Sequence, residues 1–313
     1  MANALHNRSL PRLPILMYHS VAEVAERAKK VRNTNPAYSL SVKQFREQMA
    51  YIHKDGYKTL HLDQVLSLPS PLKKEDVIPA KAGIQKVTGF RIKCGMTDSL
   101  KNTSLHINVD THVPEKSLVI TFDDGWADNY TNVFPILKEY GLTATIFVIT
   151  GFIGQSNYMD WAQLQKMSDA GISMQSHTVN HKPLAQLSTA EIKYELETSK
   201  KILENDLGKQ VKFLSLPHGV FNDKVLKLAQ EAGYQAVCTS EPGFSHEYKN
   251  LPVMKRINIS NKFQSHTFKK ILDRNEALIF PMLLSKKIKN LVRRAIGRDS
   301  YRKLYGLRYR SKT

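Results

Sequence analysis

The stretch Leu118-Val-Ile-Thr-Phe-Asp-Asp-Gly-Trp126 combines the pattern of a buried strand with two adjacent carboxylates. Its apolar run ends abruptly at Asp123 and Asp124, and Gly125 allows the backbone to turn sharply where these side chains emerge. Two neighbouring acids repel each other, and their removal from water is costly unless a cation or a hydrogen-bond donor compensates it. The stretch therefore predicts a strand that ends in a site for a cation.

A second apolar run ends in histidines further along the chain. The segment Gly171-Ile-Ser-Met-Gln-Ser-His177-Thr-Val-Asn-His181 places one imidazole at the end of a strand-like run and another four positions later. If a helical turn follows the strand, His177 and His181 lie on the same side and can bind one ion. Two imidazoles, a carboxylate and water describe an open catalytic metal site. Zn²⁺ is the first candidate, although other divalent transition metals accept the same ligands.

Each motif also has an ordinary structural explanation. An Asp-Asp-Gly sequence can form a plain turn or a helix cap, and the spacing His-x-x-x-His occurs by chance on many surface helices. A motif without its structural context is only a hypothesis. Because both motifs close an apolar strand-like run, together they favour a shared metal site.

At this level of detail the chain resembles a known family. Thr121-Phe-Asp-Asp-Gly125 and Ser176-His-Thr-Val-Asn-His181 are similar to the first two motifs of the polysaccharide deacetylases, the NodB-homology fold of carbohydrate esterase family four. The resemblance covers roughly residues 14–19 and 114–260 and keeps the motif order. It implies that Asp123 is the catalytic base. It also implies that the metal ligands are Asp124, His177 and His181.

The third motif of the family is matched only loosely, at Pro217-His-Gly219. Leu214 and Leu216 stand where many members have an Arg or a Tyr, and His218 replaces the commoner Tyr. The resemblance implies that the backbone N–H of His218 faces the developing oxyanion, which needs no particular side chain. A simple tight turn is the alternative. Family members also carry a general-acid histidine in a Leu-x-His motif, but none follows His181, so the acid is left open.

Four residues are candidates for binding the sugar: Trp126, Trp161, His19 and Pro217. His19 ends the first strand-like run, where a hydrogen-bonded structural histidine is the alternative. Trp161 either stacks on a sugar or belongs to the core, because amphipathic aromatic side chains serve both purposes.

Strand-like and helix-like runs alternate along the chain, which predicts a parallel sheet with helices outside. Strand ends that converge on one site favour a barrel with its catalytic residues at the carboxyl-terminal face. The family resemblance implies an α/β fold, a distorted, incomplete (β/α) barrel of about seven parallel strands. This domain is expected to cover residues 1–280.

Local signals predict where individual elements begin and end. Ser41-Val-Lys-Gln44 and Ser188-Thr-Ala-Glu191 are capping boxes that start helices. The second helix is expected to run to Gly208 with its many Lys and Glu residues on a solvated face. Residues 253–259 are expected to form the last strand.

Residues 69–113 interrupt the pattern, because they show turn formers, charge and no sustained period. So long a structureless loop is unusual inside a compact domain, and it is expected to be a disordered insertion without chemistry. Part of it resembles a repeat-derived peptide found inserted in unrelated bacterial proteins. A lid over the sugar site is the alternative.

Composition allows one large domain: 313 residues, 42% hydrophobic, with no apolar run long enough to span a bilayer. The first residues lack the apolar core of a secretory signal, which predicts a cytoplasmic chain. The two cysteines, Cys94 and Cys238, suit a reducing compartment and cannot form a disulfide framework.

The carboxyl-terminal arm, residues 281–313, supplies much of the net charge of +18. From Lys286 to Thr313 there are 11 Lys and Arg against one Asp, with apolar residues between them at helical spacing. Such a basic amphipathic helix suits an anionic membrane, which would place the protein at the inner face of the membrane. A helix packed on the barrel is the alternative. No nucleic-acid-binding motif accompanies the charge.

The function expected from these residues is metal-dependent removal of N-acetyl groups from an amino sugar in a polysaccharide, an oligosaccharide or a lipid-linked glycan precursor. The same site could serve an O-acetyl esterase or a deformylase acting on a sugar or glycolipid. The loose third motif and the absent Leu-x-His leave a third reading, a non-catalytic glycan-binding relative.

Overall fold

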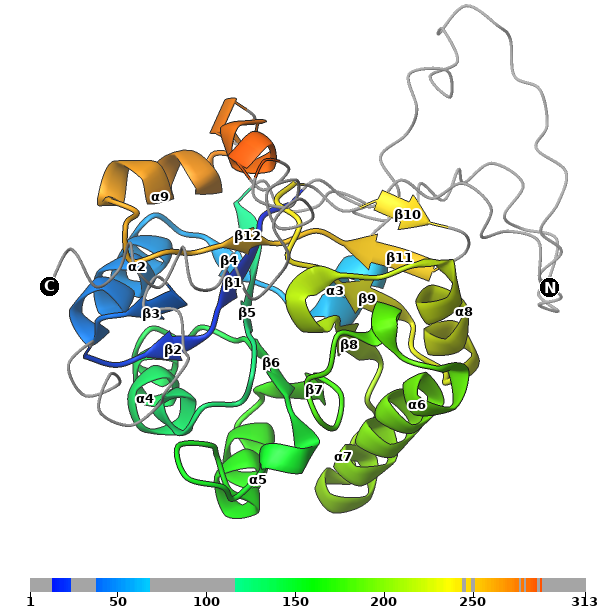
Figure 1. The fold of residues 1–313 in the computed structure, drawn as a ribbon. Helices are drawn as coiled ribbons and strands as arrows, with labels where there is room; N and C mark the ends of the chain where they lie inside the picture. The colour runs from blue at the N-terminus through cyan, green and yellow to red at the C-terminus, as the bar shows by residue number, and fades with distance from the viewer. Residues whose placement is uncertain are drawn as a thin grey trace, which may run out of the picture.

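Parallel strands form a curved sheet around which the rest of the chain is arranged (Figure 1). The structure is a computed structural model that describes residues 13–23, 38–67, 116–243, 246–248, 251–275, 277–278, 280–285 and 288. The parallel strands, in spatial order, are β12 (Ile257–Asn258), β1 (Ile15–Tyr18), β5 (Ser117–Phe122), β6 (Thr145–Val148), β7 (Ser173–Ser176), β8 (Phe213–Ser215), β9 (Ala236–Cys238) and β11 (Leu251–Met254).

Four further strands complete the sheets. β10 (His246–Tyr248) pairs antiparallel with β11, and β4 (Lys58–Thr59) pairs with the beginning of β5. β2 (Ser20–Val21) and β3 (Ser39–Leu40) form a separate two-stranded sheet.

The two ends of the parallel sheet lie near each other because β11 and β12 are consecutive in the chain. Only Lys255 and Arg256 separate them, and such a link spans about 11 Å at most. Within the described residues these end strands do not pair, so the sheet curls into a barrel that stays open. The expected incomplete (β/α) barrel is thus confirmed, with eight parallel strands rather than about seven.

The expectation of one last strand over residues 253–259 is wrong. The chain leaves the sheet at Lys255 and Arg256, and the side chain of Arg256 is 1% exposed. A guanidinium buried this deeply needs acceptors for its five N–H donors. The break between β11 and β12 lets Arg256 reach them inside the barrel.

Helices surround the strands in Figure 1. They are α2 (Val42–Lys54), α3 (Leu62–Ser67), α4 (Phe134–Glu139), α5 (Trp161–Asp169), α6 (Thr189–Lys193), α7 (Ser199–Leu207), α8 (Asp223–Glu231) and α9 (Ser265–Leu272), with the short turns η3 (Asn129–Val133), η4 (Thr150–Phe152), η5 (Leu184–Gln186), η6 (Tyr194–Thr198) and η7 (Pro217–Gly219).

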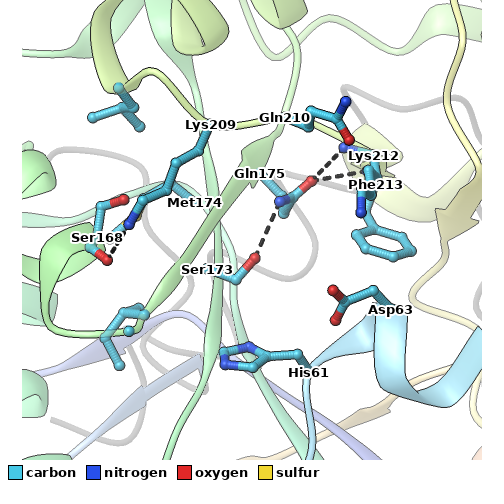
Figure 2. A pocket seen from close by; sticks show the side chains of 13 residues that line it. His61, Asp63, Ser168, Ser173, Met174, Gln175, Lys209, Gln210, Lys212 and Phe213 are labelled. Atoms are coloured by element: carbon cyan, nitrogen blue, oxygen red, sulfur yellow. Dashed lines mark hydrogen bonds between the residues drawn. The ribbon is translucent and has the colours of Figure 1, made fainter.

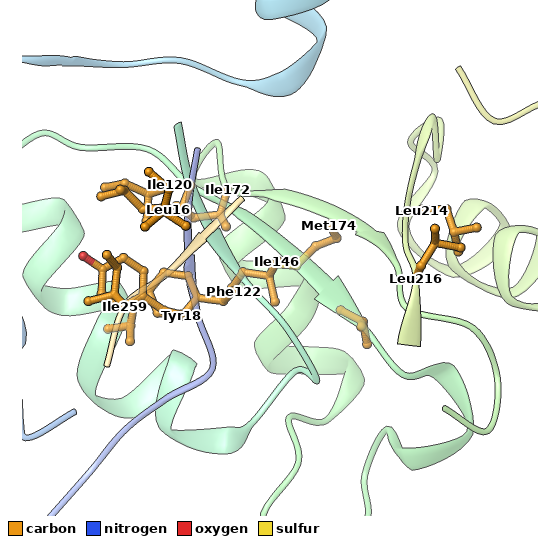
Figure 3. Close-up of a cluster of buried hydrophobic side chains, with 14 of the residues drawn as sticks. Leu16, Tyr18, Ile120, Phe122, Ile146, Ile172, Met174, Leu214, Leu216 and Ile259 are labelled. Carbon is orange, nitrogen blue, oxygen red and sulfur yellow. The ribbon is translucent and has the colours of Figure 1, made fainter. Parts of the chain in front are cut away.

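Alternate residues of each strand pack into two different hydrophobic layers. One set, which includes Leu16, Ile120 and Ile146, faces the surrounding helices (Figure 3). The other set forms an inner cluster with Val119 and Phe147. In β5 the side chains of Val119 and Thr121 point into the barrel. Because side chains alternate along a strand, Asp123, just past the strand, is the next residue to point inward.

Helix α3 closes the amino-terminal end of the barrel. Leu62 and Val65 are at most 1% exposed and belong to the inner cluster with Ile15, Val119 and Phe213. The inner cluster at this end is therefore apolar, and the residues of the predicted site lie at the carboxyl ends of the strands.

The two predicted capping boxes are present, at Ser41 with Gln44 and at Ser188 with Glu191. The helix that follows Ser188 ends at Gly208, whose φ of 62° suits a glycine. It is not one regular helix, because the π-helical turn η6 separates α6 from α7. The expected solvated face also has an exception there, since Glu195 is 2% exposed.

Several expectations lie outside the described residues: the insertion at 69–113, Cys94 and most of the carboxyl-terminal arm. Cys238 is a buried free thiol. In the part of the chain that the structure describes, no helix has the length and hydropathy needed to cross a membrane.

Candidate functional site

The predicted site residues follow three strands, β5, β7 and β8, which lie in the same part of the sheet with β6 between β5 and β7. Asp123 and Asp124 follow β5, His177 follows β7, and Pro217 follows β8. Because these strands are parallel, their carboxyl ends meet at one end of the barrel. This is the end opposite α3.

The three predicted metal ligands converge on one point. The Nε2 atoms of His177 and His181 lie 3.5 and 3.7 Å from Oδ1 of Asp124. One ligand atom from each residue lies within 4.8 Å of the others. Two donors bound to a tetrahedral Zn²⁺ at about 2.1 Å would be about 3.4 Å apart, so the two distances from the imidazoles to the carboxylate are close to those that such an ion needs.

Neighbouring groups orient two of these ligands. Nδ1 of His177 lies 2.8 Å from the carbonyl oxygen of Ser215, to which it donates when its proton is on Nδ1, and this leaves Nε2 to face the cluster. Nε1 of Trp126 donates to Oδ2 of Asp124 at 2.9 Å, which leaves Oδ1 for the imidazoles. Two imidazoles and a carboxylate with supporting hydrogen bonds are a donor set that fits a divalent cation.

The two histidines are not brought together by a helical turn, so that expectation is wrong. The segment from His177 to His181 is an irregular loop in which Thr178 has φ 66° and His181 has φ 54°. Asp124 (φ 79°) and His218 (φ 61°) are also left-handed. Such conformations are uncommon outside glycine and concentrate at functional sites. The site therefore has a strained backbone that the surrounding structure must hold.

The charges of the cluster shift the protonation of its members. Burial opposes ionisation of Asp124, but His177, His19 and His181 together lower its pKa. Burial also opposes protonation of His177, yet Asp123 and Asp124 raise its pKa. For His181, burial and the nearby His177 lower the pKa to about 3. His181 is thus neutral and can bind a cation without losing a proton, whereas the raised pKa of His177 lets a proton compete with the cation.

Asp123 is paired with a residue that the sequence interpretation missed. Arg256 donates from two nitrogens to Oδ1 and Oδ2 of Asp123, both at 2.7 Å. Its other donors go to the hydroxyls of Thr121 and Ser215 and to the carbonyl of Thr239, so all five N–H groups have acceptors. Burial opposes the charge on Asp123, but Arg256 lowers its pKa below the usual value.

A signal for this pair was present in the chain. Lys255 and Arg256 interrupt the apolar run of residues 251–259, and a cation that is buried in such a run needs a counter-ion. Asp123 needs a cation for the same reason. The sequence interpretation sought that cation only as a metal ion.

His218 and Pro217 lie in the turn η7, as the loosely matched motif predicts. The ring centre of His218 lies 4.8 Å from that of His181. A Cβ atom at Gly219 would come within 2.8 Å of the backbone nitrogen of Ser240, so this tight turn requires glycine. The oxyanion role of the His218 N–H and the sugar contact of Pro217 stay predictions.

The other candidate pocket residues differ in their surroundings. His19 stacks on Tyr38 with ring centres 5.0 Å apart, and its buried Nδ1 has no hydrogen-bond partner among the residues the structure describes. Burial lowers the pKa of His19, and Asp124 and Asp123 oppose that shift. Trp126 is 5% exposed and supports Asp124, while Trp161 packs against the outer hydrophobic cluster. Sugar contacts of all three stay predictions.

A separate cavity lies where β7 and β8 begin, at the end opposite the ligand cluster (Figure 2). Its volume is about 400 Å³, and none of the predicted site residues lines it. Gln175 crosses it, accepting hydrogen bonds from the backbone of Lys212 and Phe213 and donating to Ser173. The titratable cluster is at the other end of the barrel, so we place the chemistry there.

Comparisons with known sequences agree with this geometry. A profile of the polysaccharide deacetylase family matches residues 110–237. YxkH of Bacillus subtilis, which is assigned to the polysaccharide deacetylases, is 30% identical over 257 residues, 82% of this chain and 75% of that protein. The poly-beta-1,6-N-acetyl-D-glucosamine N-deacetylase of Staphylococcus aureus is 32% identical over 177 residues. That match spans 50% of this chain and only 59% of the staphylococcal enzyme.

Solved structures share the fold. The Streptococcus pyogenes deacetylase PplD in complex with acetate superposes with a TM-score of 0.63 and 26% identity, over 84% of this chain and 99% of that one. The polysaccharide deacetylase BC0361 of Bacillus cereus gives a TM-score of 0.62 at 23% identity, over 84% of this chain and 69% of that one, which shows a common fold. Profile, sequence and fold agree that the chain belongs to the polysaccharide deacetylases, a family of hydrolases.

Proposed function

We propose that this chain is a metal-dependent deacetylase that removes N-acetyl groups from an amino sugar in a polysaccharide, an oligosaccharide or a lipid-linked glycan precursor. The observation that carries the proposal is the cluster of Asp124, His177 and His181 directly beside the buried Asp123. The name of the staphylococcal relative describes an N-deacetylase, and PplD was solved with acetate, the product that such hydrolysis releases.

Asp124, His177 and His181 would hold the cation, most simply Zn²⁺. Once bound, it would supply a Lewis acid for the acetyl carbonyl and acidify the attacking water. Trp126 and the carbonyl of Ser215 keep the ligand atoms aimed at this position.

Asp123 would accept the proton of the attacking water. Arg256 keeps this carboxylate ionised, and the fork of two hydrogen bonds fixes its plane. In the described contacts Oδ1 accepts only from Arg256, so one of its lone pairs is available for the proton.

Two histidines are candidates for returning a proton to the departing amine. His19 is favoured because its Nδ1 has no described partner and because Asp124 and Asp123 oppose the fall in its pKa that burial causes. The backbone role expected for His218 needs no imidazole. A His19→Gln variant should therefore lose most turnover while a His218→Ala variant keeps most of it. The reverse result would assign the proton to His218.

The test of the function joins metal analysis of the purified protein to an assay of acetate release from N-acetylglucosamine oligomers and lipid-linked sugars. O-acetylated and formylated sugars, tested in parallel, separate a deacetylase from an esterase or a deformylase. Stoichiometric metal without release of acetate or formate from any of these sugars would instead identify a glycan-binding relative.

We also propose that the carboxyl-terminal arm attaches the protein to an anionic membrane surface. Residues 286–313 carry a net charge of +10. Around the start of the arm, Phe280, Leu284 and Ile288 recur every four residues and are 69%, 48% and 51% exposed. Vesicles with anionic lipid should bind the protein and neutral vesicles should not, and a Phe280→Gln/Leu284→Gln variant should bind more weakly. Equal sedimentation with both vesicle types would refute the attachment.

A further inference from the structure

Glu195 is a buried carboxylate that the proposed chemistry does not use. It lies in the π-helical turn η6, is 2% exposed, and forms no ion pair with any residue the structure describes. A buried carboxylate is costly unless hydrogen-bond donors compensate it. Its position therefore calls for an explanation.

The described donors to the Glu195 carboxylate all come from the loop that carries the metal ligands. Oε2 accepts from the backbone N–H of Val179 at 2.9 Å and of Asn180 at 2.8 Å. Oε1 accepts from the side-chain amide of Asn180 at 2.8 Å. These two residues lie between His177 and His181, so the carboxylate holds the middle of the ligand loop.

The loop needs such support because of its backbone conformation. Thr178 and His181, which flank the two bonded residues, have φ values of 66° and 54°. A left-handed conformation is particularly unfavourable for a β-branched residue such as Thr178 and persists only when surrounding contacts hold it. Charge-assisted hydrogen bonds from N–H groups to a carboxylate are stronger than neutral ones. Glu195 thus offsets the strain of the two left-handed residues.

The same helix also holds the strand from which the loop emerges. Ser199, four residues after Glu195, lies with its Oγ 2.8 Å from Oγ of Ser176 and donates to the carbonyl oxygen of Glu195 at 2.7 Å. Ser176 immediately precedes His177. The helix therefore contacts the loop on both sides of the first histidine, and the π-helical turn at η6 is a feature often found beside functional sites.

We infer that Glu195 is a positioning residue for the metal site, which sets the distance between His177 and His181 by fixing the amides of Val179 and Asn180. This inference rests on the proposed metal-dependent function. If Glu195 sets ligand geometry, its loss should weaken Zn²⁺ binding. If it only stabilises the fold, its loss should lower the unfolding midpoint and leave Zn²⁺ binding unchanged.

The experiment measures Zn²⁺ affinity by chelator competition, and unfolding midpoints with and without Zn²⁺. Glu195→Ala should weaken Zn²⁺ binding 10- to 100-fold, the usual effect of removing a group that supports a metal ligand. It should also reduce the Zn²⁺-induced rise of the midpoint. Glu195→Gln should stay within about threefold of the wild type, because a flipped Asn180 amide can re-form all three hydrogen bonds.

Glu204→Ala is the matched control. Glu204 lies on α7 and accepts from the backbone N–H of Val211 at 2.9 Å, away from the ligand loop. This variant should lower both midpoints equally and leave Zn²⁺ affinity unchanged. If Glu195→Ala does not fold, Glu195→Asp keeps the charge but withdraws it by one methylene, and the same 10- to 100-fold loss is expected.

Three results would overturn the inference or its basis. Unchanged Zn²⁺ affinity in a folded Glu195→Ala or Glu195→Asp variant would reduce Glu195 to a stabilising residue. A Glu195→Gln variant as weak as Glu195→Ala would show that hydrogen-bond geometry is not what matters. A wild-type protein that binds no Zn²⁺ would refute the metal-dependent function itself, and the role of Glu195 with it.

Discussion

The buried pair of Arg256 and Asp123 allows a quantitative test of how this site is built. Replacing Arg256 by Met keeps an apolar side chain near Phe147, whose ring centre lies 5.2 Å from the guanidinium carbon, and removes only the charged group. Asp123, which is 4% exposed, then has the hydroxyl of Ser215 as its remaining side-chain donor. The variant therefore leaves a carboxylate inside the barrel without its counter-ion.

The magnitude follows from the contacts that are lost. Removing one partner of a buried ion pair costs about 3–5 kcal/mol, because the other charge stays buried. All five donors of Arg256 have acceptors at 2.7 to 3.2 Å, so this pair has the geometry to which that figure applies. In a domain of this size each kcal/mol shifts the unfolding midpoint by about 2–4 °C, so Arg256→Met should lower it by roughly 6–20 °C.

Thermal unfolding followed by circular dichroism at pH 7 measures the effect. The matched control is Arg46→Met, which breaks an arginine pair with Glu139 whose side chains are 47% and 46% exposed, and its midpoint should barely change. Adding Asp123→Asn to Arg256→Met removes the stranded charge and should recover part of the loss. The reasoning is refuted if Arg256→Met unfolds no earlier than Arg46→Met, or if the second substitution recovers nothing.

Three further predictions concern the base, the metal and a buried thiol. Asp123→Asn should lower the rate of acetate release by about 10²- to 10⁴-fold while Zn²⁺ stays bound, and near-normal turnover would remove Asp123 from the role of base. His181→Ala should lose the stabilisation that saturating Zn²⁺ provides, about 2.7 kcal/mol at one hundred times Kd, whereas an unchanged midpoint shift on adding Zn²⁺ would exclude it as a ligand. Burial raises the pKa of Cys238 from 9.0 to about 12. Above pH 9 the unfolded chain therefore releases a proton that the folded chain keeps, and stability should fall by up to about 1.4 kcal/mol per pH unit. Cys238→Ala should remove this part of the slope in unfolding titrations between pH 8 and 11, and an identical slope in both proteins would contradict the assignment.

The parts of the fold that could be predicted are those with a local signal. The run into Asp123 and the run into His177 show both their strands and the polar residues that end them, and parallel strands bring such ends together. The capping boxes at Ser41 and Ser188 are equally local, since each involves residues three apart.

The parts that could not be predicted depend on partners distant in the chain. Residues 253–259 have the composition of one strand, and the break appears only once Arg256 is known to reach Asp123 inside the barrel. Glu195 has the spacing of a solvated helix face, and its burial depends on a loop that comes before the helix and on a π-helical turn. The hydrophobic pattern from which elements are predicted does not identify the partner of either residue.

The pairing of Arg256 with Asp123 also constrains the order in which the protein can mature during its synthesis. The two residues are 133 positions apart, so the first carboxylate leaves the ribosome long before its guanidinium partner has been made. Long-range pairings of this kind form late, and an emerging chain must keep Asp123 hydrated until then. A nascent chain that stops after β9 would contain every ligand of the metal cluster but not the group that neutralises its neighbouring acid. The last strands of the barrel are thus needed to complete the site, because Asp123 can lose its water only after Arg256 has paired with it.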